Sequence, residues 1–348
     1  TFLYKGDGGS GGPQSINNGL DLDGEGGLTI IKYRDGGFGN GFYTYDTERP
    51  NASLALNTQS PEESPDNRFE FTSTGFKVKN NGGDAVNGNG YNYASWSFRK
   101  APGFCDVVTY TGTGSVQNIA HSLGSVPGMM WVRCLVGTHD WEVYHRSTGA
   151  TQSLHINQRD GANSDSSVWN NTTPTSSQFT VGTNNNVNQS GHTYVAYIFA
   201  HDDAQYGTDA NQSLIKCGSY TTTGNGDPVT VNLGFEPQFL LIKSTAANRD
   251  WHIFDTMRGI ASKRNDMPQY PNKNYADAGL GNGNFLDLTS TGFTAIGGEI
   301  NWYNAQETVV YMAIRRPHKP PTNGTEVFNT SLWAGTGSVV TTSIFFFF

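Results

Sequence analysis

Short runs in which apolar and polar residues alternate recur along the chain and predict β-strands. In the run Trp251–Asp255, for example, Trp251 and Ile253 fall on one side of an extended chain. One face of such a strand can enter a core while the other meets a second sheet or water. No window keeps apolar residues at helical spacing over about ten residues. Segments rich in glycine and asparagine separate the runs and suit turns. The pattern therefore predicts an all-β fold.

Five landmarks recur three times in the same order, which predicts three diverged copies of one unit. An aromatic strand enters a glycine turn in Phe2–Gly6, Val108–Gly112 and Gly218–Gly224. An apolar strand ends in a cation in Gly27–Lys32, Pro127–Arg133 and Pro237–Lys243. An aromatic strand follows in Phe42–Arg49, Trp141–Arg146 and Trp251–Arg258, and a hairpin-like run in Thr74–Val78, Ser177–Val181 and Thr291–Ala295. The closing strands are Tyr93–Arg99, Tyr194–Phe199 and Val309–Arg315.

Each unit holds enough short strands for a two-sheet sandwich. We therefore expect three tandem β-sandwich, jelly-roll-like repeat domains at 1–102, 103–208 and 209–319. A sandwich of about a hundred residues can fold alone, so we expect independent beads on a string. Residues 320–348 form a C-terminal extension or the start of a further element, and they end in four phenylalanines, Phe345–Phe348.

Composition and charge narrow the class of protein. Aromatic residues make up 12% of the chain and charged residues only 15%, which argues against disorder. The net charge of −8 argues against nucleic-acid binding, which needs clustered cations. No apolar run reaches the roughly twenty residues of a membrane span. Three widely spaced cysteines, Cys105, Cys134 and Cys217, do not form a disulfide framework and suit small buried side chains.

The sequence offers no constellation typical of an enzyme, a metal centre or a cofactor site. None of the eight histidines pairs with a cysteine or carboxylate at metal-ligand spacing, and we predict no metal and no cofactor. The glycine-rich run Gly6–Gly12 lacks the Lys-Ser/Thr of a phosphate-binding loop and predicts a turn. Glu62 and Glu63 are candidates for glycoside hydrolysis by residue type alone. The run Asp21–Glu25 lacks the full spacing of a calcium loop and also suits a turn. We expect no catalytic residues.

Recurring charged and aromatic residues have structural roles in this interpretation. Asp46/Arg49 and Asp255/Arg258 recur at one position, with His145/Arg146 in the middle copy, which predicts a strand-end ion pair or turn anchor. We expect Trp141 and Trp251 to be core residues, together with Phe179 and Phe293.

Aromatic residues outside the repeated strands are the candidate surface or glycan contacts. Trp169, Trp302, Tyr270 and Tyr275 lie among asparagine, proline and other polar residues. An aromatic face stacks on the C–H groups of a sugar ring, while neighbouring amides bond its hydroxyls. Semi-buried loop anchors are the alternative interpretation of these residues.

Several runs resemble repeat domains in structural and tail-fibre-like proteins of marine tailed phages, especially those that infect cyanobacteria. They are Asp106–Gly114, His121–Gly128, Asp140–Arg146, Tyr194–His201, Gly234–Lys243, Asp255–Gly259 and Ala313–Arg316. The resemblance covers about residues 100–320 well and 1–100 loosely, because the first copy lacks the tryptophan and the Gly-Phe-x-Pro lead. It implies a virion structural or adsorption role and brings no catalytic residues.

These observations together predict a non-enzymatic, extracellular or virion structural protein, a tail-fibre or surface-appendage component that contacts other virion proteins and host-surface glycans. A bacterial carbohydrate-binding adhesin and a self-assembling extracellular filament subunit are the alternatives. We expect a homo-oligomer, because the apolar end at Phe345–Phe348 needs a covering partner. A trimer is the first expectation, by analogy with the phage fibres that the chain resembles, and a helical assembly is the second.

Overall fold

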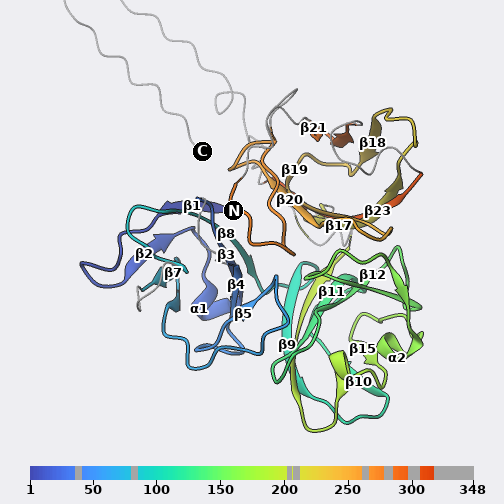
Figure 1. The fold of residues 1–348 in the computed structure, drawn as a ribbon, viewed down its shortest axis with the longest axis horizontal. Coiled ribbons are helices and arrows are strands. Elements are labelled where there is room, and N and C mark those ends of the chain that lie inside the picture. The colour runs from blue at the N-terminus through green and yellow to red at the C-terminus, as the bar shows by residue number, and fades with distance from the viewer. Residues whose placement is uncertain are drawn as a thin grey trace, which may run out of the picture. The chain divides into compact units, whose positions relative to one another are not determined.

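The computed structural model describes residues 1–35, 41–79, 85–201, 206, 212–260, 266–277, 285–296 and 306–316. The regular secondary structure of these residues is almost entirely β, which confirms the predicted fold class (Figure 1). Three single-turn helices occur among them, α1 (Leu22–Glu25), α2 (Ser166–Trp169) and α3 (Asn185–Asn188). Residues 1–315 form one compact unit. We call 1–102, 103–208 and 209–319 the first, second and third segment.

Among the described residues, every segment contains one large and one small antiparallel sheet. The large sheets have the strand orders β1-β8-β3-β4-β5, β14-β13-β12-β11-β16-β9 and β17-β23-β19-β20. The small sheets have the orders β2-β7-β6, β10-β15 and β18-β22-β21.

The strands have the following bounds. Those of the first segment are β1 (Phe2–Lys5), β2 (Gln14–Asn17), β3 (Gly27–Tyr33), β4 (Phe42–Asp46), β5 (Leu54–Ala55), β6 (Phe69–Thr72), β7 (Gly75–Val78) and β8 (Asn92–Arg99). The second segment has β9 (Cys105–Thr111), β10 (Gln117–Ala120), β11 (Pro127–Cys134), β12 (Glu142–His145), β13 (Gln152–His155), β14 (Asn163–Ser164), β15 (Gln178–Val181) and β16 (Thr193–Ala200). The third segment has β17 (Ile215–Thr221), β18 (Val229–Asn232), β19 (Pro237–Ser244), β20 (His252–Asp255), β21 (Leu286–Thr289), β22 (Gly292–Ala295) and β23 (Thr308–Arg315).

The large sheets pair their landmark strands in the same way. The closing strand (β8, β16 or β23) lies between the aromatic first strand (β1, β9 or β17) and the cation-ended strand (β3, β11 or β19). The cation-ended strand then pairs with β4, β12 or β20. In these three pairs Leu28, Met129 and Phe239 lie opposite Asp46, His145 and Asp255. The division into three repeat domains, with its boundaries, stays a prediction.

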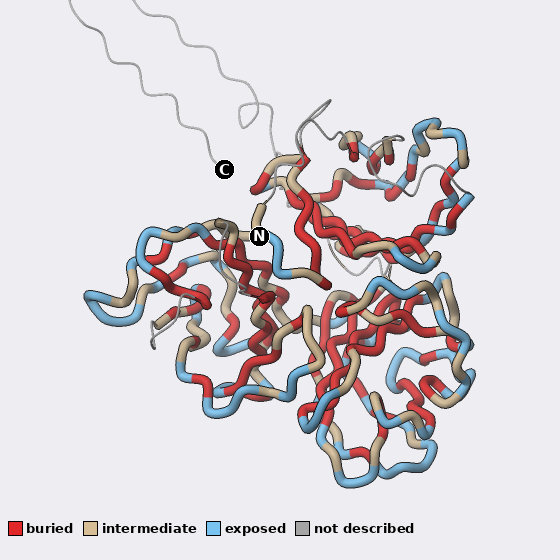
Figure 2. The backbone as a smooth tube through the Cα atoms, in the orientation of Figure 1, coloured by how far each residue is buried: buried red, intermediate tan, exposed pale blue. Residues whose placement is uncertain are grey.

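The strands at the centre of the large sheets are buried on both faces (Figure 2). In β3, Leu28 and Ile30 enter an apolar cluster to which all three segments contribute, whereas Ile31 and Tyr33 enter a cluster confined to the first segment. The shared cluster also contains Trp131 of the second segment and Leu241 of the third, among others. The third segment, like the first, also has an apolar cluster of its own. The segments therefore share one apolar cluster, and whether each can fold alone, as expected for beads on a string, stays a prediction.

Three hydrogen bonds join the segments in pairs: the first to the second, the second to the third, and the third to the first. Each bond involves the residue at the same position in its own large sheet. The carboxylate of Asp46 accepts from the Tyr197 hydroxyl (2.8 Å), which joins the first segment to the second. His145 Nε2 lies 3.1 Å from the Tyr311 carbonyl oxygen, which joins the second to the third. Trp96 Nε1 donates to the Asp255 carboxylate (3.1 Å), which joins the third to the first. The segments therefore close on one another in a cycle of contacts.

The predicted core residues and strand-end ion pairs are present. Trp141, Trp251, Phe179 and Phe293 are all buried, as expected. Asp46 pairs with Arg49 (2.5 Å) and Asp255 with Arg258 (2.6 Å), and all four side chains are nearly or fully buried. The middle copy differs, because His145 is buried whereas Arg146 is exposed.

Candidate functional site

A polar cleft of about 460 Å³ lies where the loop after β13 meets the loops on either side of β20. It is lined by Asn157, Gln158, Arg159, Asp160, Ala247, Asn248, Asn272 and Lys273. Amides, one carboxylate and two cations thus face the same space. Such a set offers donors and acceptors at several angles, which suits a ligand rich in hydroxyl groups.

Two asparagines fix the wall of the cleft. The side-chain oxygens of Asn157 and Asn272 accept from the backbone N–H groups of Trp141 and Trp251, each at 3.0 Å. Their amide nitrogens donate to aspartates, Asn157 to Asp140 at 2.7 Å and Asn272 to Asp250 at 2.6 Å. Both side-chain amides are therefore engaged in hydrogen bonds within the protein. Contacts to a ligand must come from the residues around them.

The charged residues of the cleft are held by contacts between the second and third segments. Arg159 donates to the Asn248 carbonyl oxygen (2.9 Å), and its Nε lies 3.2 Å from Asp250. The buried ammonium of Lys243 donates to the Asp160 carbonyl oxygen (2.7 Å), and burial lowers the pKa of Lys243 to about 8. The Asp160 carboxylate, which is half exposed, lies 2.8 Å from His155. The rim of the cleft is thus preorganised and remains accessible.

One of the four predicted aromatic contacts is exposed beside this cleft. Tyr275 is 52% exposed, and its ring lies 5.8 Å from the ammonium of Lys273, which lines the cleft. Tyr270 is buried and packs edge-on against Tyr275 with ring centroids 5.9 Å apart, so it supports the exposed ring. Tyr275 is the predicted candidate best placed to contact a ligand.

A third predicted candidate, Trp169, does not contribute to this cleft. Trp169 is buried because it ends α2 and packs against Tyr144, with ring centroids 6.1 Å apart, so it is a core residue and no surface contact. Trp302 lies outside the described residues.

The acidic candidates are engaged in structural contacts. Glu62 pairs with Arg49 (2.9 Å), and Glu63 pairs with Arg68. Asp21 caps α1 by accepting from the Gly24 N–H (2.8 Å), as expected for turn chemistry.

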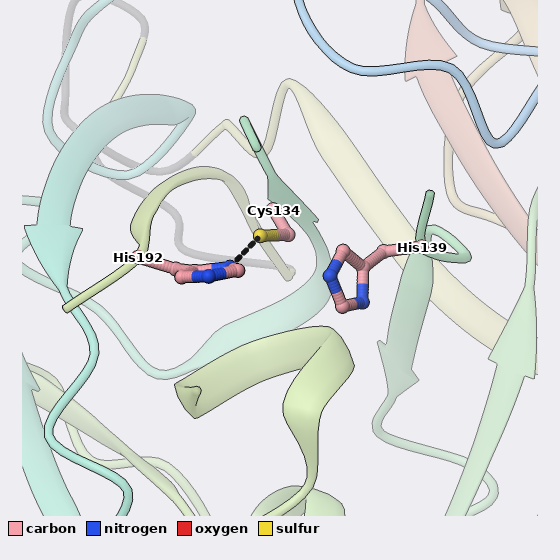
Figure 3. Close-up of side chains that lie close together, drawn as sticks. All are labelled: Cys134, His139 and His192. Atoms are coloured by element: carbon pink, nitrogen blue, oxygen red, sulfur yellow. Dashed lines mark hydrogen bonds between the residues drawn. The ribbon is translucent and has the colours of Figure 1, made fainter. Parts of the chain in front are cut away.

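A second cluster of chemical interest joins Cys134, His139 and His192 (Figure 3). One potential ligand atom from each residue lies within 4.8 Å of the others, which is close enough to hold a metal ion. Cys134 ends β11, His139 lies in the loop before β12, and His192 lies just before β16. Sequence reasoning missed this cluster because His192 is distant in sequence. Only four residues separate Cys134 from His139, and that short interval was the available signal.

The other two cysteines, Cys105 and Cys217, are buried and free, as expected.

The family comparison covers all of the described residues. A family model described as "Domain of unknown function (DUF7483)" matches residues 1–317. The chain belongs to this family. No curated protein matches it. The DUF7483 match spans all three segments, so the polar cleft and the Cys134–His139–His192 cluster both lie within the family region. Within the described part of this DUF7483 chain, no helix is long and apolar enough to cross a membrane.

Proposed function

We propose that this DUF7483 protein is a non-enzymatic structural protein of a virion or another extracellular assembly, and that it binds a saccharide in the cleft lined by Asn157–Asp160 and Lys273. The cleft itself is the observation that supports the proposal most. It combines fixed amides, an accessible carboxylate and accessible cations with an exposed tyrosine ring at one side.

The chemistry of these groups matches a sugar. Asp160 and Asn248 offer acceptors to hydroxyl groups, and Arg159 and Lys273 offer donors. The exposed face of Tyr275 suits the apolar C–H face of a pyranose ring, while the buried Tyr270 holds that ring in place. Few of these groups need to move on binding, which lowers the entropic cost of association.

Saccharide binding is tested by screening the intact chain on a glycan array and measuring the affinity of the best ligand by calorimetry. Tyr275→Ala should weaken binding about tenfold or more, since loss of a stacked ring costs about 1 kcal/mol beyond its buried area. Tyr275→Phe keeps the ring and should bind nearly as well as the parent. Met257→Ala, which removes an exposed side chain outside the cleft lining, is the matched control.

A second pair of variants tests the polar rim. Asp160→Asn and Arg159→Gln should each weaken binding, because they alter groups that face the cleft. Binding that survives all the cleft variants unchanged would place the saccharide elsewhere, and no binding to any glycan would overturn the proposal.

The location of the protein is a separate part of the proposal. Mass spectrometry of purified virions from the source should detect this chain if it is a virion component. Detection only in cell-surface fractions would favour the adhesin alternative. Light scattering tests the proposed homo-oligomer, in which residues 322–348, outside the described residues, would contact a second copy.

A further inference from the structure

We propose that Cys134, His139 and His192 bind a Zn²⁺ ion, with a solvent molecule as the fourth ligand. This site is independent of the saccharide proposal, because its residues do not line the cleft. One thiolate and two imidazoles form a ligand set that zinc accepts in tetrahedral geometry, and three protein ligands leave one position open.

The spacing of the ligand atoms fits one small ion. Cys134 Sγ and His192 Nδ1 are 3.5 Å apart. Two ligands at about 2.3 Å and about 2.0–2.1 Å from a tetrahedral zinc ion would be separated by roughly 3.5 Å. The third ligand atom, on His139, lies within 4.8 Å of the ligand atoms of both Cys134 and His192. Figure 3 shows the two imidazole rings on either side of the sulfur. A small inward movement of His139 would complete the geometry.

The hydrogen bonds around His139 prepare it to act as a ligand. Asn186 Nδ2 donates to the Glu142 carboxylate (2.9 Å), so the amide oxygen of Asn186 faces His139 Nδ1 (3.2 Å). That oxygen can only accept, so Nδ1 carries the proton and Nε2 keeps its lone pair. Metal-binding histidines are commonly oriented by such a partner on the other ring nitrogen.

The backbone around the site is held firmly. The buried guanidinium of Arg133 donates to the His139 carbonyl oxygen and, at 2.5 Å, to the Ser60 carbonyl oxygen of the first segment. On the opposite side, the His192 carbonyl oxygen accepts from the Gly112 N–H (2.8 Å). Both loops that carry histidines are thus anchored to the large sheet. Such anchoring limits the conformational entropy lost on metal binding.

Binding of Zn²⁺ releases one proton, that of the Cys134 thiol. The Cys134 thiol lies 3.1 Å from the Val136 carbonyl oxygen and can donate to it. When Zn²⁺ binds, the S–H bond breaks, its proton leaves to solvent, and the thiolate donates an electron pair to the metal. His139 and His192 bind as neutral imidazoles.

The site is tested by titrating the metal-free, full-length chain with Co²⁺, which reports thiolate ligation through a sulfur-to-metal charge-transfer band and tetrahedral geometry through its visible bands. We expect both signals to saturate at one equivalent and to disappear when Zn²⁺ displaces Co²⁺. We also expect Zn²⁺ to raise the melting temperature, because it binds the folded form.

Variants separate this site from adventitious binding. Cys134→Ser should remove the charge-transfer band, whereas Cys105→Ala, at another buried cysteine, should keep it. His139→Gln changes only a partly exposed loop residue and should also abolish one-equivalent binding. Asn186→Ala, at a positioning residue, should weaken binding about 10–100-fold while the band keeps its shape.

Three results would overturn the proposal. They are the absence of a charge-transfer band at equimolar Co²⁺ and protein, a band that persists in Cys134→Ser, and binding of Cu²⁺ with no binding of Zn²⁺ or Co²⁺. Circular dichroism of each variant distinguishes loss of the site from loss of the fold.

Discussion

In each large sheet, one buried polar side chain makes a hydrogen bond to the next segment. Whether this side chain donates or accepts is complementary to its partner on that segment. Asp46 faces the Tyr197 hydroxyl and Asp255 faces the Trp96 indole N–H, and both of these partners are donors. His145 faces a backbone carbonyl, which is an acceptor. The Ser147 N–H lies 3.1 Å from His145 Nδ1 and donates to it, so the proton of the neutral ring is on Nε2. Burial lowers the pKa of His145 to about 4, so the ring is neutral at pH 7.

This match predicts that His145→Asp is strongly destabilising. The aspartate would be buried against the Tyr311 carbonyl oxygen in place of the imidazole donor. An uncompensated buried charge costs about 3–5 kcal/mol, which urea denaturation would reveal as a lower free energy of unfolding. The exposed neighbour provides the control, since Arg146→Ala should change stability by less than about 0.5 kcal/mol. Equal stabilities of His145→Asp and the parent would show that this contact is not formed.

Trp251 combines apolar burial with one hydrogen bond to the second segment. Its side chain is 1% exposed, and its indole N–H donates to the His155 carbonyl oxygen (2.8 Å). Trp251→Ala should lower the free energy of unfolding by about 3–5 kcal/mol, because a large aromatic side chain leaves a cavity. Trp251→Phe keeps most of the apolar volume and should cost less than Trp251→Ala.

The same denaturation experiment includes Met257→Ala as a control on an exposed side chain, for which we expect a change within about 0.5 kcal/mol. A Trp251→Ala variant that unfolds at the parent's midpoint would contradict the observed burial.

At the scale of elements, the strand pair β12–β13 contains a charge network where β12 begins and β13 ends. Glu142 lies opposite His155 in the register, with 3.1 Å between His155 Nε2 and the carboxylate, and Asp160 lies 2.8 Å from the other ring nitrogen. Burial alone would lower the pKa of His155. The hydrogen bonds and charges of Glu142 and Asp160, with Asp140 nearby, outweigh burial and raise that pKa to about 9.

Because the pKa of His155 is raised, the stability that this residue contributes decreases as the pH rises. The protonated His155 stabilises the folded state fully below its ordinary pKa of about 6.5, and this contribution is lost as the pH rises to about 9. The free energy of unfolding of His155→Gln should therefore approach that of the parent as the pH rises from 6 to 9. Lys32 and Lys243, whose pKa values burial lowers to about 8, act in the opposite direction. Comparing variant and parent at each pH cancels their effect, and a difference that does not vary with pH would contradict the prediction.

At the scale of the whole molecule, the shared core makes the three segments depend on one another. Phe98 of the first segment packs against Phe199 of the second (5.4 Å between ring centroids) and Phe239 of the third (5.8 Å). Removal of one segment would expose apolar surface on the other two, at a cost proportional to that area.

We therefore expect residues 1–315 to unfold in one cooperative transition. Calorimetry should give a calorimetric enthalpy equal to the van't Hoff enthalpy. Asp46→Asn and Asp255→Asn, in different segments, should each shift this single transition, whereas Asp227→Asn at the surface should leave it in place. Three separate transitions would restore the interpretation of independent beads.

The sequence by itself determined the local features of this protein. Alternation and glycine turns predicted the strands, and the recurrence of Asp46/Arg49 at Asp255/Arg258 predicted an ion pair three residues apart. Burial of Trp141 and Trp251 followed from their places in the predicted aromatic strands, although each lies just before the observed β12 or β20. Each of these features depends on neighbours along the chain or across one hairpin, so its pattern is visible in sequence.

The tertiary structure alone decided how the segments meet. It placed Trp169 in the core through α2, left Tyr275 exposed beside the cleft, and brought His192 to Cys134. It also brought large-sheet residues of all three segments into one shared cluster, which alternation cannot distinguish from separate cores because either arrangement buries both strand faces. Contacts between distant residues depend on how whole sheets pack, and the packing of sheets leaves no periodic signal in one sequence.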